Sequence, residues 1–238
     1  KPLNSYLWQQ QAEQLLFDKN KAPELRDRKV IVIHDAVGNN GKSAWLKNIR
    51  LRMKELVIRK MSVDRADRTK AAACKMFNRS DVDILVIDLP RTQGDSTDLK
   101  GFFEALEDIK NGWITDTMYG SYNEAIFDPP IVLILTNMNP AKFVGFMSID
   151  RWIIFEIANQ KKFKGANDNY KHFRTLVPME INENREYQQK DLDKSKIKYY
   201  IEFGQSNPHT AFEEIYGLPD QEKKKKQASN INIDYTSI

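Results

Sequence analysis

The sequence predicts an α/β protein with a central, mostly parallel sheet. Short apolar runs rich in β-branched residues alternate with helix-prone segments from Val30 to Ile157. The runs are apolar almost throughout rather than at every second residue, and such runs are typical of parallel strands that helices cover on both faces. Regular alternation of helices with strands of this kind indicates a parallel sheet.

The first expected element is a helix from Ser5 to Phe17. Its apolar residues recur near a helical period, and Ser5 can cap its start. The polar segment from Asp18 to Asp27 links this helix to the first strand. Two roles remain open for the helix, which either packs on the core or mediates contacts between subunits.

The other elements follow in chain order. A β-hairpin is expected from Trp113 to Asn123, directly after the helix stop at Asn111 and Gly112. Strands are expected from residue 30 and at 56–61, 82–89, 131–135 and 152–157, and helices at 42–54, 64–78 and 98–109.

The chain changes character after these elements. From about Asn159 it is polar and rich in Lys, Asn, Gln and Asp, with one short helix expected from Thr210 to Tyr216. The four-lysine run from Lys223 to Lys226 is either a solvated tail or a nuclear-localisation or nucleic-acid segment. The expected organisation is an N-terminal helical segment and linker at 1–28, a core at 29–158 and a polar C-terminal region at 159–238.

Composition narrows the class of protein. The apolar and charged fractions, 41% and 29%, are those of a soluble globular protein, and no apolar run is long enough to span a bilayer, so no membrane partner is expected. Cys74 is the only cysteine, which excludes a disulfide within the chain and favours an intracellular, reducing compartment. The net charge of +4 permits nucleic-acid binding without demonstrating it. No initiator Met precedes Lys1, and we expect the chain to be part of a longer protein.

A candidate phosphate-binding loop follows the first strand. Backbone N–H groups of the loop and of the next helix can hold phosphates, Lys42 can reach the β- and γ-phosphates, and the Ser43 hydroxyl can ligate Mg²⁺. The strict pattern has Gly where this chain has Ala36. ATP and Mg²⁺ are the predicted cofactors, and the predicted nucleotide-binding residues are Gly38, Asn39, Asn40, Gly41, Lys42, Ser43 and Ala44.

Polar residues at the ends of later strands complete the predicted site. Asp88 ends an apolar run and is placed to hold Mg²⁺, although a strand-end Asp can also cap a turn. Asn137 follows another buried strand, where it can touch the γ-phosphate or instead form a turn. Arg151 precedes the last strand and can stabilise the charge of a phosphoryl-transfer transition state, while the alternative is a surface salt bridge with Asp150.

These motifs together resemble the superfamily 3 helicase domain of Rep, the replication initiator of circular single-stranded DNA viruses and related plasmids. The similarity is to the nanovirus, alphasatellite and circovirus-like branch and covers roughly residues 8–157. The motifs that carry it, in order, are Gly38-x-x-Gly41-Lys42-Ser43, the run from Ile84 to Arg91, Lys110-Asn-Gly, Ile134-Leu-Thr-Asn137 and Asp150-Arg-Trp152.

The resemblance implies an AAA+-like core that forms hexameric rings and moves 3′ to 5′ on single-stranded DNA with ATP and Mg²⁺, in the host nucleus. It implies that the helix at 5–17 serves oligomerisation. A nicking HUH endonuclease domain would precede this chain, whose three histidines are scattered singly.

The resemblance also assigns roles to single residues. Lys42 and Ser43 become the phosphate and Mg²⁺ ligands, Asp88 the Walker B acid, Asn137 the sensor, and Arg151 an arginine finger presented to the neighbouring subunit's ATP. A hairpin within residues 110–122 would grip DNA, and the predicted nucleic-acid contacts are Lys110, Tyr119 and Tyr122, with Trp113 as a further base-stacking candidate. The alternative for these aromatic side chains is to pack the root of the hairpin.

Two positions depart from the family pattern. Leu89 stands where many relatives have a second acid that polarises the attacking water, so Asp88 does both jobs or another acid enters from elsewhere; the candidates are Asp95, Asp98 and Glu104. Met118 precedes the hairpin Tyr119, where relatives often have lysine, which leaves the identity of the DNA-gripping cation open.

The expected function is therefore an ATP-dependent DNA helicase. One alternative is an assembly scaffold that binds ATP and DNA but hydrolyses little. Further alternatives are a superfamily 3 helicase of an RNA virus and a P-loop kinase that acts on small molecules or nucleosides.

Overall fold

A seven-stranded sheet forms the centre of the protein. The computed structural model describes residues 6–17, 22–89, 96–120, 122–159, 174–181 and 187–189, all within one compact unit of residues 1–190. The strand order is β2-β3-β6-β1-β7-β8-β9, and the first five strands of that order are parallel. The strands are β1 (Val30–His34), β2 (Ile58–Met61), β3 (Ile84–Leu89), β6 (Ile131–Thr136), β7 (Trp152–Asn159), β8 (Arg174–Ile181) and β9 (Tyr187–Gln189). The prediction of an α/β protein with a mostly parallel sheet is confirmed.

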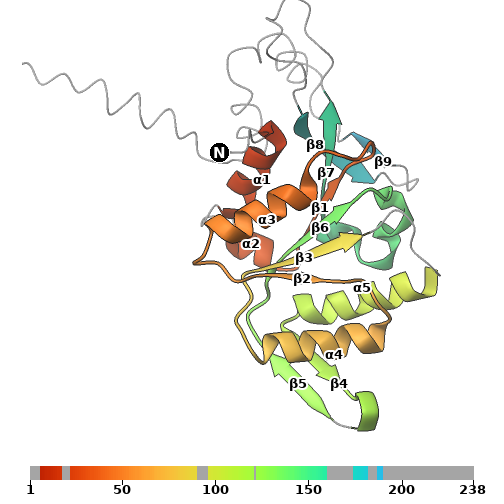
Figure 1. Cartoon of the computed structure of the whole chain (residues 1–238). Coiled ribbons are helices and arrows are strands. Elements are labelled where there is room, and N and C mark those ends of the chain that lie inside the picture. Colours follow the sequence, from red (N-terminus) through yellow and green to blue (C-terminus); the bar gives the residue numbers. More distant parts are fainter. Residues whose placement is uncertain are drawn as a thin grey trace, which may run out of the picture. The chain divides into compact units, whose positions relative to one another are not determined.

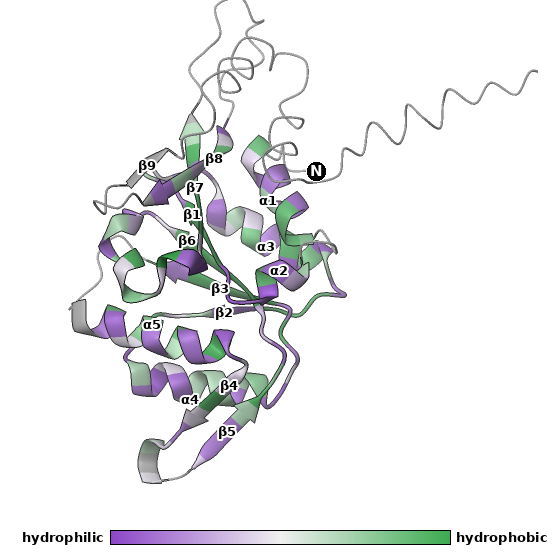
Figure 2. Ribbon diagram, turned by 180° about the vertical axis from the view of Figure 1, so that it is seen from behind, coloured by the Kyte–Doolittle hydropathy of each residue, from purple (hydrophilic) through white to green (hydrophobic). Residues whose placement is uncertain are grey.

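Helices cover both faces of this sheet (Figure 1). On one side lie α1 (Leu7–Phe17), α2 (Ala22–Arg26) and α3 (Lys42–Arg52), and on the other α4 (Ala66–Phe77) and α5 (Ser96–Lys110). This two-sided cover explains the unbroken apolar runs, because every residue of β1 and β6 is buried. Figure 2 shows the resulting band of hydrophobic strands at the centre of the fold.

The N-terminal helix α1 packs on the core. Trp8 and Ala12 have no exposed surface, and Leu15 and Leu16 are buried as well. The packing role left open by the sequence is therefore present, and a role between subunits stays a prediction. The segment predicted as a linker contains a short helix, α2, which the polar sequence did not indicate.

A β-hairpin is present where it was predicted to begin, as β4 (Trp113–Asp116) and β5 (Asn123–Ile126), but the predicted end at Asn123 is wrong, because the second strand only starts there. It packs on α4, where Asn78 Nδ2 donates to the backbone oxygen of Glu124 at 3.0 Å. Trp113 and Tyr122 are 58% and 65% exposed, so neither packs the root of the hairpin. Tyr122 donates its hydroxyl to Glu124, and this hydrogen bond raises the pKa of the phenol. Tyr119 lies in a 3₁₀ turn, Met118–Gly120, and its side chain lies outside the described part of the chain.

The sheet continues past the predicted boundary after residue 158. β8 pairs antiparallel with β7, with Ile154 opposite Met179, and β9 pairs with β8. The boundary is therefore wrong, because the segment counted with the polar C-terminal region supplies two strands to the central sheet. The helix expected at 210–216 and the lysine run at 223–226 lie outside the described residues.

Within the described residues, no helix is long and apolar enough to cross a membrane.

Candidate functional site

The candidate phosphate loop joins the carboxyl end of β1 to the start of α3. Gly38, Asn39 and Gly41 have positive φ angles of 88°, 60° and 76°. No side chain caps α3, so the N–H groups of its first turn remain available to a ligand. Ala36 is not among the positive-φ residues, and the missing glycine of the strict pattern is therefore not required by the backbone here.

A buried carboxylate that the sequence analysis did not single out organises the loop. Asp35 has no exposed surface and accepts three hydrogen bonds, from Gly38 N at 2.7 Å, Asn40 Nδ2 at 2.5 Å and Lys42 Nζ at 2.7 Å. Burial alone would raise the pKa of Asp35, but the hydrogen bonds and the Lys42 charge outweigh it and leave the pKa below its ordinary value. Asp35 is therefore a charged anchor for the loop and the lysine.

The structure brings the predicted Lys42 and Asn137 together. Lys42 Nζ also donates to Asn137 Oδ1 at 3.2 Å, and Asn137 Nδ2 donates to the backbone oxygen of Asp35. The backbone N–H of Asp35 donates to Thr136 O at 2.8 Å, which joins the ends of β1 and β6. Asn137 is thus held against the phosphate loop rather than turned into solvent.

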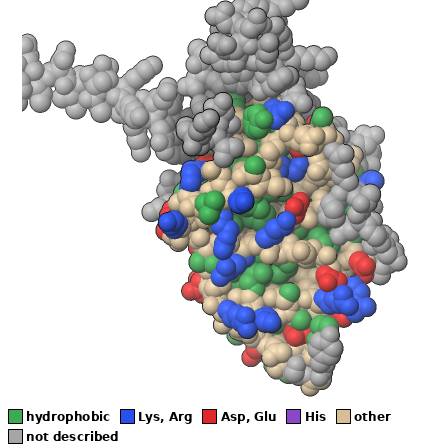
Figure 3. Space-filling view, viewed as in Figure 1, with side chains coloured by type: hydrophobic (Ala, Val, Ile, Leu, Met, Phe, Trp, Pro, Cys, Tyr) green, Lys and Arg blue, Asp and Glu red, His purple; other side chains and the backbone are tan. Residues whose placement is uncertain are grey.

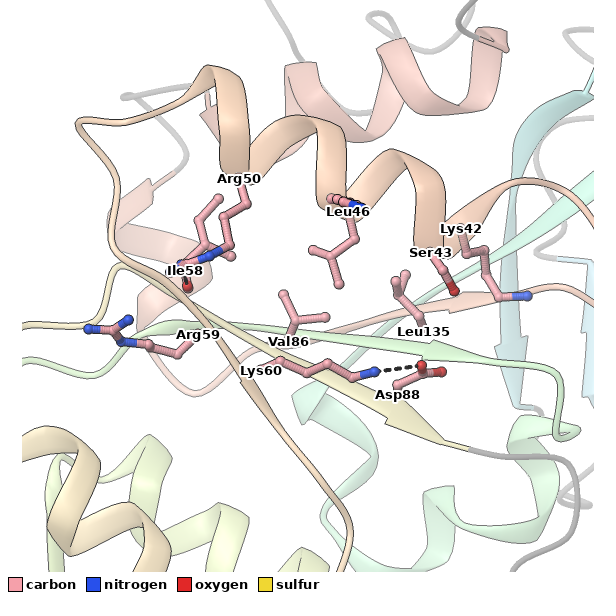
Figure 4. Close-up of a pocket in the computed structure, with 11 residues that line it drawn as sticks. Lys42, Ser43, Leu46, Arg50, Ile58, Arg59, Lys60, Val86, Asp88 and Leu135 are labelled. Atoms are coloured by element: carbon pink, nitrogen blue, oxygen red, sulfur yellow. Dashed lines mark hydrogen bonds and ion pairs between the residues drawn. The ribbon is translucent and has the colours of Figure 1, made fainter. Parts of the chain in front are cut away.

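The predicted Mg²⁺ ligands Ser43 and Asp88 line a cleft of about 470 Å³ between α3 and strands β2, β3 and β6 (Figure 4). Asp88 is half-exposed, and its Oδ2 accepts a hydrogen bond from Lys60 Nζ at 2.9 Å. The residues after β3 that would form such a turn lie outside the described part of the chain, so the turn-capping alternative for Asp88 stays open. The lining residues are Lys42, Ser43, Leu46, Lys47, Arg50, Ile58, Arg59, Lys60, Val86, Asp88 and Leu135.

The cleft is strongly cationic. Among the described residues that line it, five are Lys or Arg and one is acidic. Figure 3 shows these basic side chains gathered on the face formed by α3 and β2. Cations concentrated beside a low-dielectric wall attract anions and raise their local concentration, so the electrostatics of the cleft suit a polyphosphate.

The residues present fit a Mg²⁺ ion that a nucleotide brings with it. Among the described residues, no group of three or more His, Cys, Asp or Glu side chains could hold a metal on its own. Ser43 and Asp88 offer two oxygen ligands, and Mg²⁺ is usually held by one or two such groups together with phosphate oxygens and water.

Arg151 lies at the opposite edge of the sheet. It directly precedes Trp152, which pairs with Val30 at the start of β1. Its side chain is 9% exposed, with Nε 3.3 Å from Glu107 Oε1, while Nε and Nη1 make no hydrogen bond. The alternative of a surface pair with Asp150 is wrong, since Asp150 pairs with Arg28 at 3.7 Å.

The predicted DNA contact at Lys110 is wrong. Lys110 is 2% exposed, and its Nζ donates to the backbone oxygens of Leu25 at 3.1 Å, Arg26 at 2.6 Å and Pro130 at 3.0 Å. The ammonium group thus ties the end of α5 to α2 and to the segment before β6. A cation enclosed in this way cannot touch a DNA backbone.

The burial of Lys110 gives the protein a pH-dependent stability. Burial lowers the pKa of Lys110 from 10.5 to about 7; Asp27 opposes this shift, and the charges of Arg151 and Arg26 add to it. The unfolded chain therefore binds more protons than the folded one between these two pKa values. The free energy of unfolding consequently rises with pH between about 7 and 10.5.

We expect the free energy of unfolding to rise by about 2 kcal/mol from pH 7 to about pH 9, at 1.36 kcal/mol per pKa unit. Lys110→Met, which removes the titrating group, should flatten this rise in urea unfolding measured at a series of pH values. Lys100→Met on the same helix is the control, because Lys100 is 64% exposed. A rise that persists in Lys110→Met would assign the effect to another group.

The position where the family pattern has a second acid is buried. Leu89 is 1% exposed and belongs to the hydrophobic core. Asp98 and Glu104 lie on α5, where Glu104 pairs with Lys100 at 3.7 Å, and Asp95 lies outside the described residues.

In comparisons with known proteins, no family model matches the chain and no curated protein matches its sequence. The fold and the geometry of the site therefore carry the functional argument.

Proposed function

We propose that this chain is an ATP-hydrolysing domain with an AAA+-like core, and that it acts as a DNA helicase of the superfamily 3 type. The observation that carries the proposal is the position of Lys42. Its ammonium group joins Asp35 and Asn137 at the mouth of the loop, beside a cleft that Ser43 and Asp88 line. The sequence predicted four of these five residues from separate stretches of the chain.

The strand order supports this proposal. β1 carries the loop and lies between β6, which leads to Asn137, and β7, while β3 with Asp88 follows next to β6. The loop, Asp88 and Asn137 therefore lie at one carboxyl edge of the sheet. Ligands of open α/β sheets bind outside this edge.

Each residue has a stated task in this proposal. Lys42 neutralises the terminal phosphates, and Asn137 orients the γ-phosphate or the attacking water. A Mg²⁺ ion on Ser43 and Asp88 would supply charge neutralisation between the phosphates. Arg151 would act on the ATP of a neighbouring copy in a homo-oligomeric ring, expected to be a hexamer.

DNA binding is proposed at the β4–β5 hairpin. Trp113 and Tyr122 expose large aromatic surfaces there, and stacking of single-stranded bases on such side chains tolerates any sequence. With Lys110 enclosed, the backbone-gripping cation must come from another part of the chain. The nuclear location and the HUH endonuclease domain expected from the resemblance remain proposals.

Steady-state ATP hydrolysis with and without single-stranded DNA tests the function. We expect DNA to stimulate turnover in the wild type, and Asp88→Ala to lower turnover by about a hundredfold or more because a Mg²⁺ ligand is lost. Asp81→Ala, at an exposed acid before β3, is the matched control and should leave turnover unchanged. Stimulation by RNA and not by DNA would favour the RNA-virus helicase instead.

The scaffold remains the second candidate, and the burial of Leu89 favours it. With an apolar core residue in place of the second acid, the described site shows one carboxylate in the cleft, and Lys60 holds it. A scaffold would bind ATP and DNA but show no stimulated turnover, and Asp88→Ala would then change nothing in the hydrolysis assay.

A further inference from the structure

A tyrosine and an arginine form a stacked pair on the outer side of the phosphate loop. The Cζ atom of Arg174, at the start of β8, lies 4.4 Å from the centre of the Tyr6 ring, just before α1. Arg174 Nη1 donates to the backbone oxygen of Asn39 at 3.5 Å. A Cβ atom placed on Gly41 would lie 3.4 Å from Tyr6 Cε2. Both side chains therefore contact the loop itself.

Several contacts hold this pair in place. Trp8 Nε1 donates to Asn40 O at 3.2 Å, which fixes the start of α1 on the loop. Gln11 Oε1 accepts from the backbone N–H of Leu176 at 2.9 Å and from Thr175 Oγ1 at 3.0 Å, which fixes α1 on β8. The pair of Tyr6 and Arg174, called the platform below, is thus preorganised by α1 and β8, which are far apart in the sequence.

The position of the phosphate ligands indicates which part of a nucleotide lies beside Tyr6 and Arg174. The terminal phosphates belong at Lys42, Ser43 and Asp88, and Asp88 is carried by β3, on one side of β1 in the sheet. The rest of a nucleotide must leave the loop in another direction. Arg174 belongs to β8, on the opposite side of β1 from β3.

Arg174 also has an unused donor. Its Nε is buried and makes no hydrogen bond in the structure. A buried N–H without an acceptor costs free energy, so a shift of the Arg174 side chain that turns Nε toward an acceptor on a ligand would be favourable. Tyr6 is 37% exposed, so part of its surface is open to the same ligand.

We propose that Tyr6 and Arg174 form the nucleobase-binding part of the nucleotide site. This inference rests on the proposed function and names the residues that receive the base. The base stacks on the exposed part of the platform, and Arg174 Nε–H donates to an acceptor atom of the base or ribose. Since stacking recognises the face of a base rather than its edge, purine nucleotides are expected to bind with similar affinity.

Calorimetric binding of Mg-ATP and of Mg-tripolyphosphate tests the proposal, because tripolyphosphate has the phosphates without the base. Tyr6→Ala should weaken ATP binding about tenfold, as expected for the loss of one stacked base, and leave tripolyphosphate binding unchanged. Tyr6→Phe is the matched control, since it keeps the ring, and should bind ATP nearly as the wild type does. GTP should bind the wild type within a fewfold of ATP.

Each other outcome has a distinct meaning. If Tyr6→Ala binds ATP as the wild type does, the base lies elsewhere and the inference is wrong. Equal weakening of ATP and tripolyphosphate also overturns it, because Tyr6 would then act through the shape of the loop. If the wild type binds neither probe, the proposed function itself fails.

Discussion

Lys42→Ala is expected to abolish ATP turnover and also to destabilise the fold. Turnover should fall by at least about a hundredfold, because the cation on the terminal phosphates is removed. The second effect follows from Asp35, which has no exposed surface. Of the three groups that donate hydrogen bonds to its carboxylate, Lys42 is the charged one, and the substitution removes it. Breaking a buried pair from one side typically costs about 3 kcal/mol or more.

A double substitution separates the two effects. Lys42→Ala combined with Asp35→Asn removes the buried charge, and Asn Oδ1 can still accept from Gly38 N. Chemical unfolding should therefore show the double variant to be more stable than Lys42→Ala alone, while ATP turnover stays absent. If stability falls further in the double variant, the two side chains do not act as a pair.

The pH dependence provides a second signature of the pair. In the wild type the pKa of Asp35 is lowered, so the stability it contributes is present above the ordinary value of 3.8 and is lost as pH falls through the folded pKa. Lys42→Ala removes the hydrogen bond and the charge of Lys42, which both lower the pKa of Asp35, so this pKa is expected to be higher than in the wild type. This variant should then gain stability relative to the wild type as the pH is lowered, which unfolding curves at several pH values can measure.

The predicted site residues that the structure brings together share one property. Lys42, Asp88 and Asn137 each follow an unbroken apolar run or a glycine-rich turn, so parallel pairing alone brings them to one edge of the sheet. Asp35 also follows such a run, and its position directly after β1 was a usable signal. Its role could not be predicted because it depends on a loop that turns back to direct three donors at one carboxylate.

Lys110 shows why a residue that is close to a hairpin in the sequence need not have an exposed side chain. The residue stands at the end of α5, next to the hairpin in the sequence, but its ammonium group points toward α2. The short polar sequence of α2 carries almost no helical signal, so the three carbonyl oxygens that enclose Lys110 were not foreseeable. Similarly, β8 lies beyond a long polar segment, and only its pairing with β7 assigns it to the sheet.

Arg151→Ala is expected to lower ATP turnover about a thousandfold while the Kd for ATP stays unchanged, as for an arginine finger supplied in trans. Arg151 lies at the edge of the sheet opposite the phosphate loop, and so it cannot serve the ATP of its own chain. Its Nε and Nη1 are buried and make no hydrogen bond among the described residues, so the side chain would turn outward to reach the γ-phosphate of a neighbouring subunit as an acceptor. Turnover and nucleotide binding are measured separately.

Glu107→Gln is the matched control, because it removes the charge that faces Arg151 at 3.3 Å and keeps the arginine. If Arg151 only supports the fold, both variants should lose stability and turnover together. If it acts in trans, Glu107→Gln keeps turnover per folded molecule, and mixing Arg151→Ala with Lys42→Ala protein restores some activity. In such a mixture an intact arginine meets an intact phosphate loop at part of the hybrid interfaces, so complete absence of rescue would argue against an arginine that acts in trans.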